Sequence, residues 1–356
     1  MEKSVAKFFL GANSSEGFVS HFGDSYNPFD GWKAYIIKGG PGTGKSSFMK
    51  FLVAKANDKN IKTELFPCSS DPESLDAVIF PDKKIAVMDG TAPHVVEPLF
   101  PGICEEILNF GQFWDREYLD GKTEIILKLT KDNKMLHKSA SRYLKAAGQL
   151  IKDNFRKASA CADMLKIQKF AETLCKKRIP DSNKKGREWV RFLCGITPKG
   201  VVSYANTAVE NYENKIIIDD RNGFAANEII SAVKEKGIKC GYEVITVKNP
   251  FLPSTICDGV IIPELSLCIM REYSFQHFNT KSRRIHAQRF YDEKKLNSSK
   301  QKMNFNSKII KQLLISAAEV LQKAKAVHDE LEKEYISAMD FEKLTEFANK
   351  FSEKIL

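Results

Sequence analysis

The sequence repeats itself once along its 356 residues, and this repeat restricts the possible folds more than any other feature. Four segments recur in the same order at offsets of 177 to 183 residues: 8–20 in 191–203, 35–37 in 215–217, 76–81 in 258–263, and 113–115 in 290–292. An ordered series with a nearly constant offset predicts a tandem duplication, with repeats at 1–180 and 187–356. The charged segment 176–186, which contains Pro180 and Gly186, is typical of a linker between them.

Each predicted repeat changes character about halfway along. Its first part alternates short β-branched runs with helical stretches, which indicates an α/β unit with a mainly parallel sheet. Its second part, about 111–180 or 290–356, has apolar residues at three- and four-residue spacing, which is typical of amphipathic helices. We therefore expect antiparallel helical hairpins, or arms, appended to each α/β core, with the apolar stripes packed in the core.

Composition excludes several classes of protein. Apolar residues make up 43% of the chain, too many for a disordered protein. No apolar run approaches the 20 or so residues of a membrane span, and residues 1–10 lack the apolar core of a secretory signal. The eight cysteines contain no Cys-x-x-Cys pair, which favours reduced thiols in a cytoplasmic protein over a zinc site or disulfides.

The net charge of +10 is compatible with nucleic-acid binding, but it comes mostly from lysines spread along the chain. Solvated lysine faces are therefore the favoured interpretation of this charge, and nucleic acid is an unfavoured partner that composition does not exclude. One local basic stretch, residues 281–289, offers either a nucleic-acid contact, a solvated face or a contact with phosphates at the site described next.

Residues 39–46 read Gly-Gly-Pro-Gly-Thr-Gly-Lys-Ser and match the pattern Gly-x-x-x-x-Gly-Lys-[Ser/Thr]. A strand-like run precedes the match and an apolar-periodic helix follows it, the order in which backbone amides and a helix N-terminus converge on phosphate. Lys45 is expected to neutralise the β- and γ-phosphates, and the Ser46 hydroxyl to ligate Mg²⁺. The predicted nucleotide-binding residues are Gly39, Gly40, Pro41, Gly42, Thr43, Gly44, Lys45, Ser46 and Ser47.

Acidic and imidazole side chains at neighbouring strand ends complete the predicted site. Asp89 follows Lys84 and the apolar run 85–88, and it is the candidate second ligand of Mg²⁺. Since ligands of open α/β sheets bind at the carboxyl ends of strands, His94 or Thr91 is a candidate sensor of the γ-phosphate, with capping or packing as the alternative for the histidine. Asp71 or Glu73, in the loop 68–73, is a candidate for polarising the attacking water, with helix capping as the alternative for Asp71.

Taken together, the glycine loop, Cys-Ser-Ser-Asp at 68–71, Val-Met-Asp-Gly-Thr-Ala-Pro-His at 87–94 and the duplication resemble a little-characterised bacterial family of tandem P-loop ATPase-like proteins. The resemblance covers the whole chain and implies a duplicated P-loop NTPase fold that binds ATP. The absence of an Asn-Lys-x-Asp motif also favours ATP over GTP.

The second repeat departs from the pattern that this resemblance implies. Residues 219–227 read Asp-Asp-Arg-Asn-Gly-Phe-Ala-Ala-Asn, a shorter loop with two carboxylates and no lysine. Arg271 stands at the counterpart of Asp89, where a cation cannot hold Mg²⁺. We therefore expect a pseudo-ATPase that has lost its nucleotide site. Arg221 and Arg271 are candidates for lending a cation to the first site.

The sequence supports three functions. The leading one is a Mg²⁺-dependent ATPase with one competent site, whose bound state moves the helical arms, and these arms can contact an unidentified protein partner. A kinase for a nucleotide or small metabolite is the second, weakened because Arg116, Arg142 and Arg156 are too widely separated to suggest a phosphate lid. The third is a nucleotide-gated scaffold with little turnover.

Overall fold

The two halves of the chain contain six-stranded sheets with the same strand order. The computed structural model describes residues 5–356. The first sheet has the order β1 (Ala6–Lys7), β5 (Glu64–Pro67), β6 (Leu75–Phe80), β7 (Ile85–Asp89), β4 (Lys33–Lys38), β8 (Glu105–Asn109). The second has the corresponding order β9 (Arg187–Arg191), β13 (Glu243–Lys248), β14 (Cys257–Ile262), β15 (Leu267–Glu272), β12 (Asn214–Asp219), β16 (Arg283–His286).

The direction of the strands also matches between the two sheets. β6 runs antiparallel to β5 and β7, and β14 runs antiparallel to β13 and β15, whereas the other neighbours are parallel. These are mixed sheets of mostly parallel strands, so the α/β prediction is confirmed. One helix follows the same strand in each sheet: α1 (Lys45–Asp58) follows β4, and α6 (Phe224–Lys239) follows β12. A short helix, α5 (Ala205–Val209), precedes β12.

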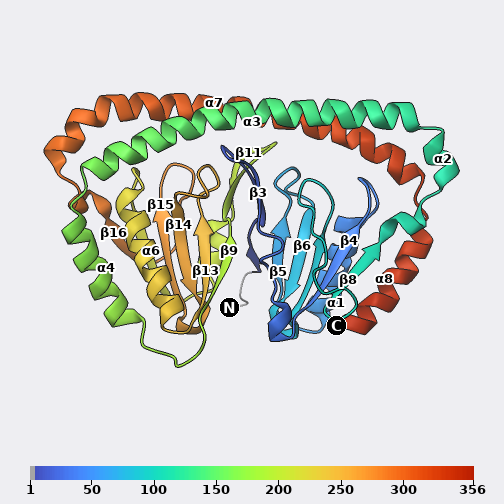
Figure 1. Ribbon diagram of the computed structural model, residues 1–356, viewed down its shortest axis with the longest axis horizontal. Coiled ribbons are helices and arrows are strands. Elements are labelled where there is room, and N and C mark those ends of the chain that lie inside the picture. The colour runs from blue at the N-terminus through green and yellow to red at the C-terminus, as the bar shows by residue number, and fades with distance from the viewer. Residues whose placement is uncertain (1–4) are drawn as a thin grey trace.

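A shared core joins the halves at the centre of the molecule. Two hairpins, β2–β3 (Gly11–Ser14 and Gly17–Ser20) and β10–β11 (Cys194–Thr197 and Gly200–Ser203), lie between the sheets (Figure 1). Phe9 and Phe192 exchange backbone hydrogen bonds of 2.7 and 2.9 Å there. One buried cluster includes Ile36 and Met88 of the first sheet with Ile217 and Met270 of the second. The two sheets therefore share one apolar core, although within residues 5–356 they are not hydrogen-bonded to each other as one sheet.

Two long helices run along one side of both sheets. α3 (Thr123–Ala160) and α7 (Glu293–Ser337) lie side by side and antiparallel (Figure 1). At 1.5 Å per residue they are about 57 and 68 Å long. The short helix α2 (Arg116–Asp120) precedes α3. No helix in the described part of the chain is both long enough and apolar enough to cross a membrane.

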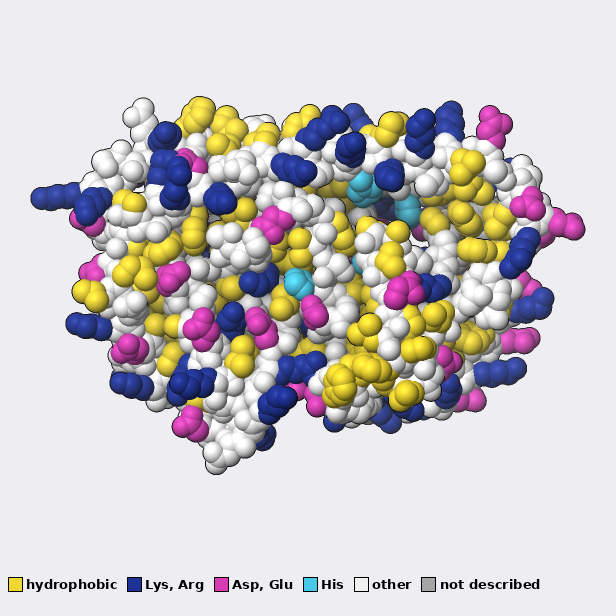
Figure 2. Space-filling view, in the orientation of Figure 1, with side chains coloured by type: hydrophobic (Ala, Val, Ile, Leu, Met, Phe, Trp, Pro, Cys, Tyr) yellow, Lys and Arg dark blue, Asp and Glu magenta, His cyan; other side chains and the backbone are white. Residues whose placement is uncertain are grey.

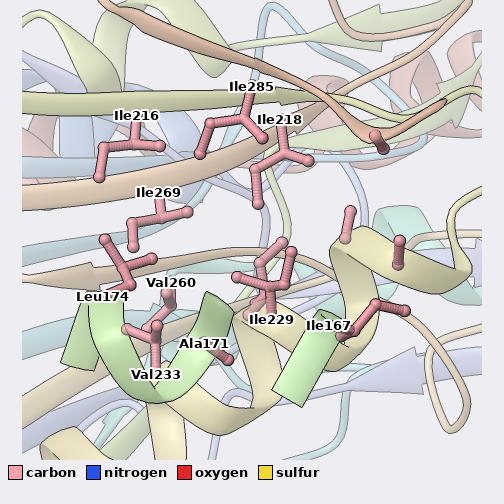
Figure 3. Close-up of a cluster of buried hydrophobic side chains, with 14 of the residues drawn as sticks. Ile167, Ala171, Leu174, Ile216, Ile218, Ile229, Val233, Val260, Ile269 and Ile285 are labelled. Atoms are coloured by element: carbon pink, nitrogen blue, oxygen red, sulfur yellow. The ribbon is translucent and has the colours of Figure 1, made fainter. Parts of the chain in front are cut away.

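The terminal helix of each arm covers the sheet of the other half. α4 (Met164–Arg178) places Ile167, Ala171 and Leu174 against α6 and the second sheet (Figure 3). α8 (Phe341–Ile355) packs Leu344, Ala348, Phe351 and Ile355 against α1 and the first sheet. The two halves thus exchange their terminal helices. The prediction that each arm forms an antiparallel hairpin on the core of its own half was therefore wrong. Among residues 5–356, α7 is the only helix of comparable length against which the apolar stripe of α3 can pack, so α3 does not fold back on the 15-residue α4.

Each exchanged helix is held by the same backbone clamp. The amide of Asp115 donates to the Ala338 carbonyl at 2.8 Å, and that of Asp340 donates to the Phe113 carbonyl at 2.9 Å. The pairs Asp292–Cys161 and Asp163–Phe290 repeat this arrangement, both at 2.8 Å. All four aspartates also cap the N-terminus of a helix through their side chains. The predicted linker 176–186 begins inside α4, which continues to Arg178.

Candidate nucleotide site

The glycine loop, residues 39–44, connects the carboxyl end of β4 to the first turn of α1. Gly42 and Gly44 have φ values of 67° and 78°, in the left-handed region that glycine adopts without strain. Lys45 begins the helix, and its Nζ donates to the carbonyl oxygens of Gly40 at 2.6 Å and Gly39 at 3.3 Å. The Ser46 hydroxyl accepts a hydrogen bond from the Leu75 amide at 2.9 Å. Lys45 and Ser46 thus lie together at a helix N-terminus, a place that favours anions.

Asp89 ends β7, the strand next to β4, and reaches the glycine loop. Its Oδ2 lies 3.5 Å from Lys45 Nζ, and its Oδ1 accepts from the Thr91 amide and hydroxyl at 2.9 and 2.6 Å. Burial by itself raises the pKa of Asp89, but His94, Lys45 and Thr91 together bring that pKa below its ordinary value. The carboxylate is therefore held ionised beside the lysine.

His94 lies against the same carboxylate. Its Nε2 is 3.9 Å from Asp89 Oδ2, and only 6% of its surface is exposed. The ring stacks on Phe22, with centroids 4.5 Å apart and planes 9° apart, and neither ring nitrogen has a hydrogen-bond partner. Burial alone lowers the pKa of His94, but Asp76 and Asp89 reverse this effect and raise it. His94 is therefore packed, as the alternative interpretation predicts, and it also lies beside two acidic groups, Asp76 and Asp89.

Asp76 completes this cluster, and we did not assign it a role from the sequence. It lies on β6, opposite Asp89 in the antiparallel register, and it is buried. Burial, followed by repulsion from Asp89, raises the pKa of Asp76 to about 6 against the attraction of His94. Ligand atoms of Asp76, Asp89 and His94 all lie within 4.8 Å of one another. The available signal was the repeated Asp-x-Val-Ile-x-Pro motif, which served only to align the repeats.

The donor atoms of this cluster fit Mg²⁺. Magnesium prefers oxygen ligands, usually one or two carboxylates plus waters and substrate phosphates. Asp76 and Asp89 offer carboxylate oxygens within the cluster, and the Ser46 hydroxyl lies at the start of α1, next to the glycine loop. His94 adds an imidazole, which transition metals bind more readily than Mg²⁺ does.

Asp71 lies in a turn away from these contacts. Its two carboxylate oxygens accept from the Glu73 amide at 3.3 Å and the Ser74 hydroxyl at 2.9 Å. Lys325 of α7 lies 3.5 Å from Oδ2. The structure therefore gives Asp71 the local role of holding a turn, together with an ion pair to the long helix.

The exchanged arm of the second half covers the glycine loop. A Cβ at Gly42 would lie 2.6 Å from the Glu332 carbonyl oxygen, and one at Gly44 would lie 2.9 Å from Leu344. The Gly42 amide donates to Glu332 Oε1 at 3.4 Å. His328, 3.5 Å from the same oxygen, is the main cause of the lowered pKa of Glu332. The carboxylate thus takes one of the amides expected to bind phosphate.

The corresponding loop of the second half, residues 220–223, is occupied by its own side chain. The Asp220 carboxylate accepts from the Asn222 amide at 3.1 Å and from the Ala226 amide, in the first turn of α6, at 2.9 Å. The Tyr291 hydroxyl donates to both of its oxygens, at 3.1 and 3.0 Å. An internal anion therefore sits at the start of α6.

Arg271 fills the position that corresponds to Asp89. Its Nη1 donates to Asp258 at 3.0 Å, its Nε to the Asp220 carbonyl at 2.8 Å and its Nη2 to the Arg221 carbonyl at 3.2 Å. Arg271 is 5% exposed and Asp258 is 1% exposed. The guanidinium is bound within its own half, so the prediction that Arg271 lends a cation to the first site was wrong. The second half reaches that site through α7 and α8 instead.

The basic stretch 281–289 is largely engaged with its surroundings. Arg284 pairs with Glu272, and His286 lies 3.1 Å from Asp219. The Arg289 guanidinium lies over the rings of Phe170 and Phe290, at 5.7 and 5.3 Å from their centroids. These contacts leave this stretch with less free charge than its sequence suggests.

The chain matched no protein-family model, and the searches of curated proteins and of solved structures found no match either. The functional argument therefore depends on the geometry of the site and on the motifs in the sequence.

Proposed function

We propose that the protein is a P-loop NTPase, the product of a tandem duplication, that binds ATP with Mg²⁺ at one site in the first half and hydrolyses it. The observation that carries this proposal is the position of Lys45 at the start of α1, 3.5 Å from the Asp89 carboxylate at the end of the adjacent parallel strand. A lysine and a carboxylate at neighbouring strand ends meet the needs of a nucleotide phosphate and its metal ion.

Each group then has a defined task. The amides of residues 39–44 and the Lys45 ammonium bind the phosphates, and Ser46 and Asp89 hold Mg²⁺, which supplies charge stabilisation at the phosphate oxygens. Lys45 must leave the carbonyls of Gly39 and Gly40 to do this, since it now donates to both. Asp76, whose pKa is raised to about 6, is suited to accept a proton from an attacking water.

The second half acts as a pseudo-ATPase in this proposal. Asp220 occupies the amides at the start of α6, and Arg271 provides a fixed cation beside Asp258. A nucleotide would have to displace a buried ion pair and a bonded carboxylate there, at the cost of leaving charges unpaired.

ATP binding is coupled to the arms through Glu332. Phosphate and Glu332 compete for the Gly42 amide, and two anions at that distance repel each other strongly. Occupancy by ATP therefore moves the end of α7 away from the glycine loop. This contact also favours the nucleotide-gated scaffold as a second candidate, which differs from the ATPase in its rate of turnover.

The test is a calorimetric titration with Mg²⁺ and a non-hydrolysable ATP analogue. We expect one nucleotide per chain, and Lys45→Ala should weaken binding by about 100-fold, since it removes charge-assisted hydrogen bonds. Lys50→Ala, an exposed lysine on the same helix, is the control. Unchanged affinity in Lys45→Ala, or a second site that survives it, would overturn the proposal. Phosphate release with and without a panel of acceptors then separates hydrolysis from kinase activity.

A further inference from the structure

The net positive charge of the chain is concentrated on its two long helices. α3 and α7 contain 18 Lys and Arg residues and nine Asp and Glu residues, so they carry nine of the ten net positive charges. These helices comprise 83 of the 356 residues. The rest of the protein is close to neutral, which is a stronger segregation of charge than the composition alone suggested.

On α3 the cations form a single stripe. The basic stripe consists of eight exposed residues at spacings of three, four or seven: Lys128, Lys131, Lys134, Lys138, Arg142, Lys145, Lys152 and Arg156. At about 100° per residue they fall within roughly one third of the helix circumference, over about 42 Å. The opposite face of α3, with Ala140, Leu144 and Ala147, is buried in a cluster with residues of α7. The stripe therefore points away from the core.

The basic stripe lacks the internal ion pairs found at other exposed cations. Lys184, Lys333 and Lys343 each lie within 3 Å of a carboxylate. Within residues 5–356, Arg156 is the single member of the stripe within 4 Å of a carboxylate, that of Asp153. Figure 2 shows Lys and Arg side chains gathered along the edge formed by the long helices. Like charges at this spacing each cost a few tenths of a kcal/mol, and a polyanion removes that cost.

We propose that the basic stripe binds the phosphate backbone of a nucleic acid duplex. The stripe is long enough to follow about 12 base pairs at 3.4 Å each. Its members contain no aromatic side chain to stack on bases, so contacts with phosphate and little base readout are expected. A helix that lies on a membrane presents its apolar face to lipid, whereas the apolar face of α3 is buried against α7.

The test measures fluorescence anisotropy of labelled 20-base-pair duplexes of mixed sequence, DNA and RNA, from 50 to 200 mM salt. The full-length protein should bind, with affinity falling steeply as salt rises. The variant Lys131→Gln/Lys138→Gln/Lys145→Gln should bind about tenfold or more weakly, and its log–log salt slope should be smaller by about 2 to 3. The matched control is Lys169→Gln/Lys176→Gln/Lys177→Gln, which removes three exposed lysines from α4.

Equal losses in the two triple variants would show a response to net charge and overturn the proposal. Absence of binding to either duplex at 50 mM salt would overturn it as well, as would binding to phosphatidylserine vesicles without binding to the duplexes. Circular dichroism checks that both variants keep their helices. Lys45→Ala should bind the duplex as the parent does, so failure of this proposal is distinguishable from failure of the ATPase proposal.

Discussion

The two loops that follow β4 and β12 show opposite arrangements of charge on the same framework. In the first half a cation, Lys45, lies at the helix start and an acid, Asp89, ends the neighbouring strand. In the second half an acid, Asp220, lies at the helix start and a cation, Arg271, stands near the end of the corresponding strand. The difference teaches that one fold supports either a loop neutralised by its own Asp220 carboxylate or a loop whose Gly42 amide is contacted by a carboxylate from the other half, Glu332.

The difference extends to how completely the polar groups are satisfied. Arg271 and Asp258 bond to each other and to the loop. In the first half both nitrogens of His94 and the indole Nε1 of Trp114, beside Gly40, are buried without a partner. Buried unpaired donors are costly. Around the glycine loop the first half therefore keeps buried polar groups without a protein partner among residues 5–356, whereas Arg271 and Asp258, at the corresponding place in the second half, bond to each other.

The largest expected effect is on the stability of the second half. Arg271→Ala leaves the buried Asp258 carboxylate without its partner, and we expect the free energy of unfolding to fall by about 3–5 kcal/mol. Asp89→Asn, at the corresponding position, should change it by less than about 1 kcal/mol, since the amide oxygen still accepts from Thr91. Urea denaturation measures both variants. Similar losses in the two would contradict the comparison.

A somewhat smaller effect should appear in the pH dependence of the first half. The pKa of Asp76 is raised from 3.8 to about 6, so the folded state binds this proton more tightly than the unfolded state does. The stabilisation that this bound proton gives the folded state is complete below about pH 4 and is lost as pH rises through 6. The free energy of unfolding falls by about 3 kcal/mol over this change. From pH 4 to 7, the unfolding free energy of the parent should therefore fall by that amount relative to the unfolding free energy of Asp76→Asn.

His94 contributes in the same direction as Asp76, because its pKa is also raised, whereas the pKa of Asp89 is lowered. Urea denaturation of both proteins at pH 4 and pH 7 therefore provides the readout as a difference between parent and variant. A difference that stays constant across this range would show that Asp76 does not bind its proton more tightly on folding.

The smallest expected effect concerns the arm that covers the glycine loop. Glu332→Gln removes a charge that competes with phosphate at the Gly42 amide, and affinity for the ATP analogue should rise by about three- to tenfold. The control is Glu330→Gln, two residues earlier on α7, where the carboxylate pairs with Lys333 at the surface. Weaker binding by Glu332→Gln would mean that this carboxylate supports the bound nucleotide instead of excluding it.

Much of the fold was predictable from local patterns. The repeat offsets predicted two units of one kind, and the two sheets share order and direction. The aromatic-Asp segments 113–115 and 290–292 were matched correctly, since both hold the clamp at the start of an arm. The pattern did not indicate which sheet each terminal helix covers. An apolar stripe specifies that a face is buried, but many apolar surfaces satisfy it equally well.

For the candidate site, the sequence by itself determined the glycine loop, Lys45, Ser46 and Asp89, because a loop between a strand and a helix is encoded by adjacent residues. Only the tertiary structure placed Asp76 beside Asp89, through the pairing of antiparallel strands, and brought Glu332 to Gly42 across 290 residues of chain. It also decided that Arg271 points into its own half, towards Asp258. A buried charge takes the nearest partner of opposite sign, and that partner is defined by packing and not by sequence distance.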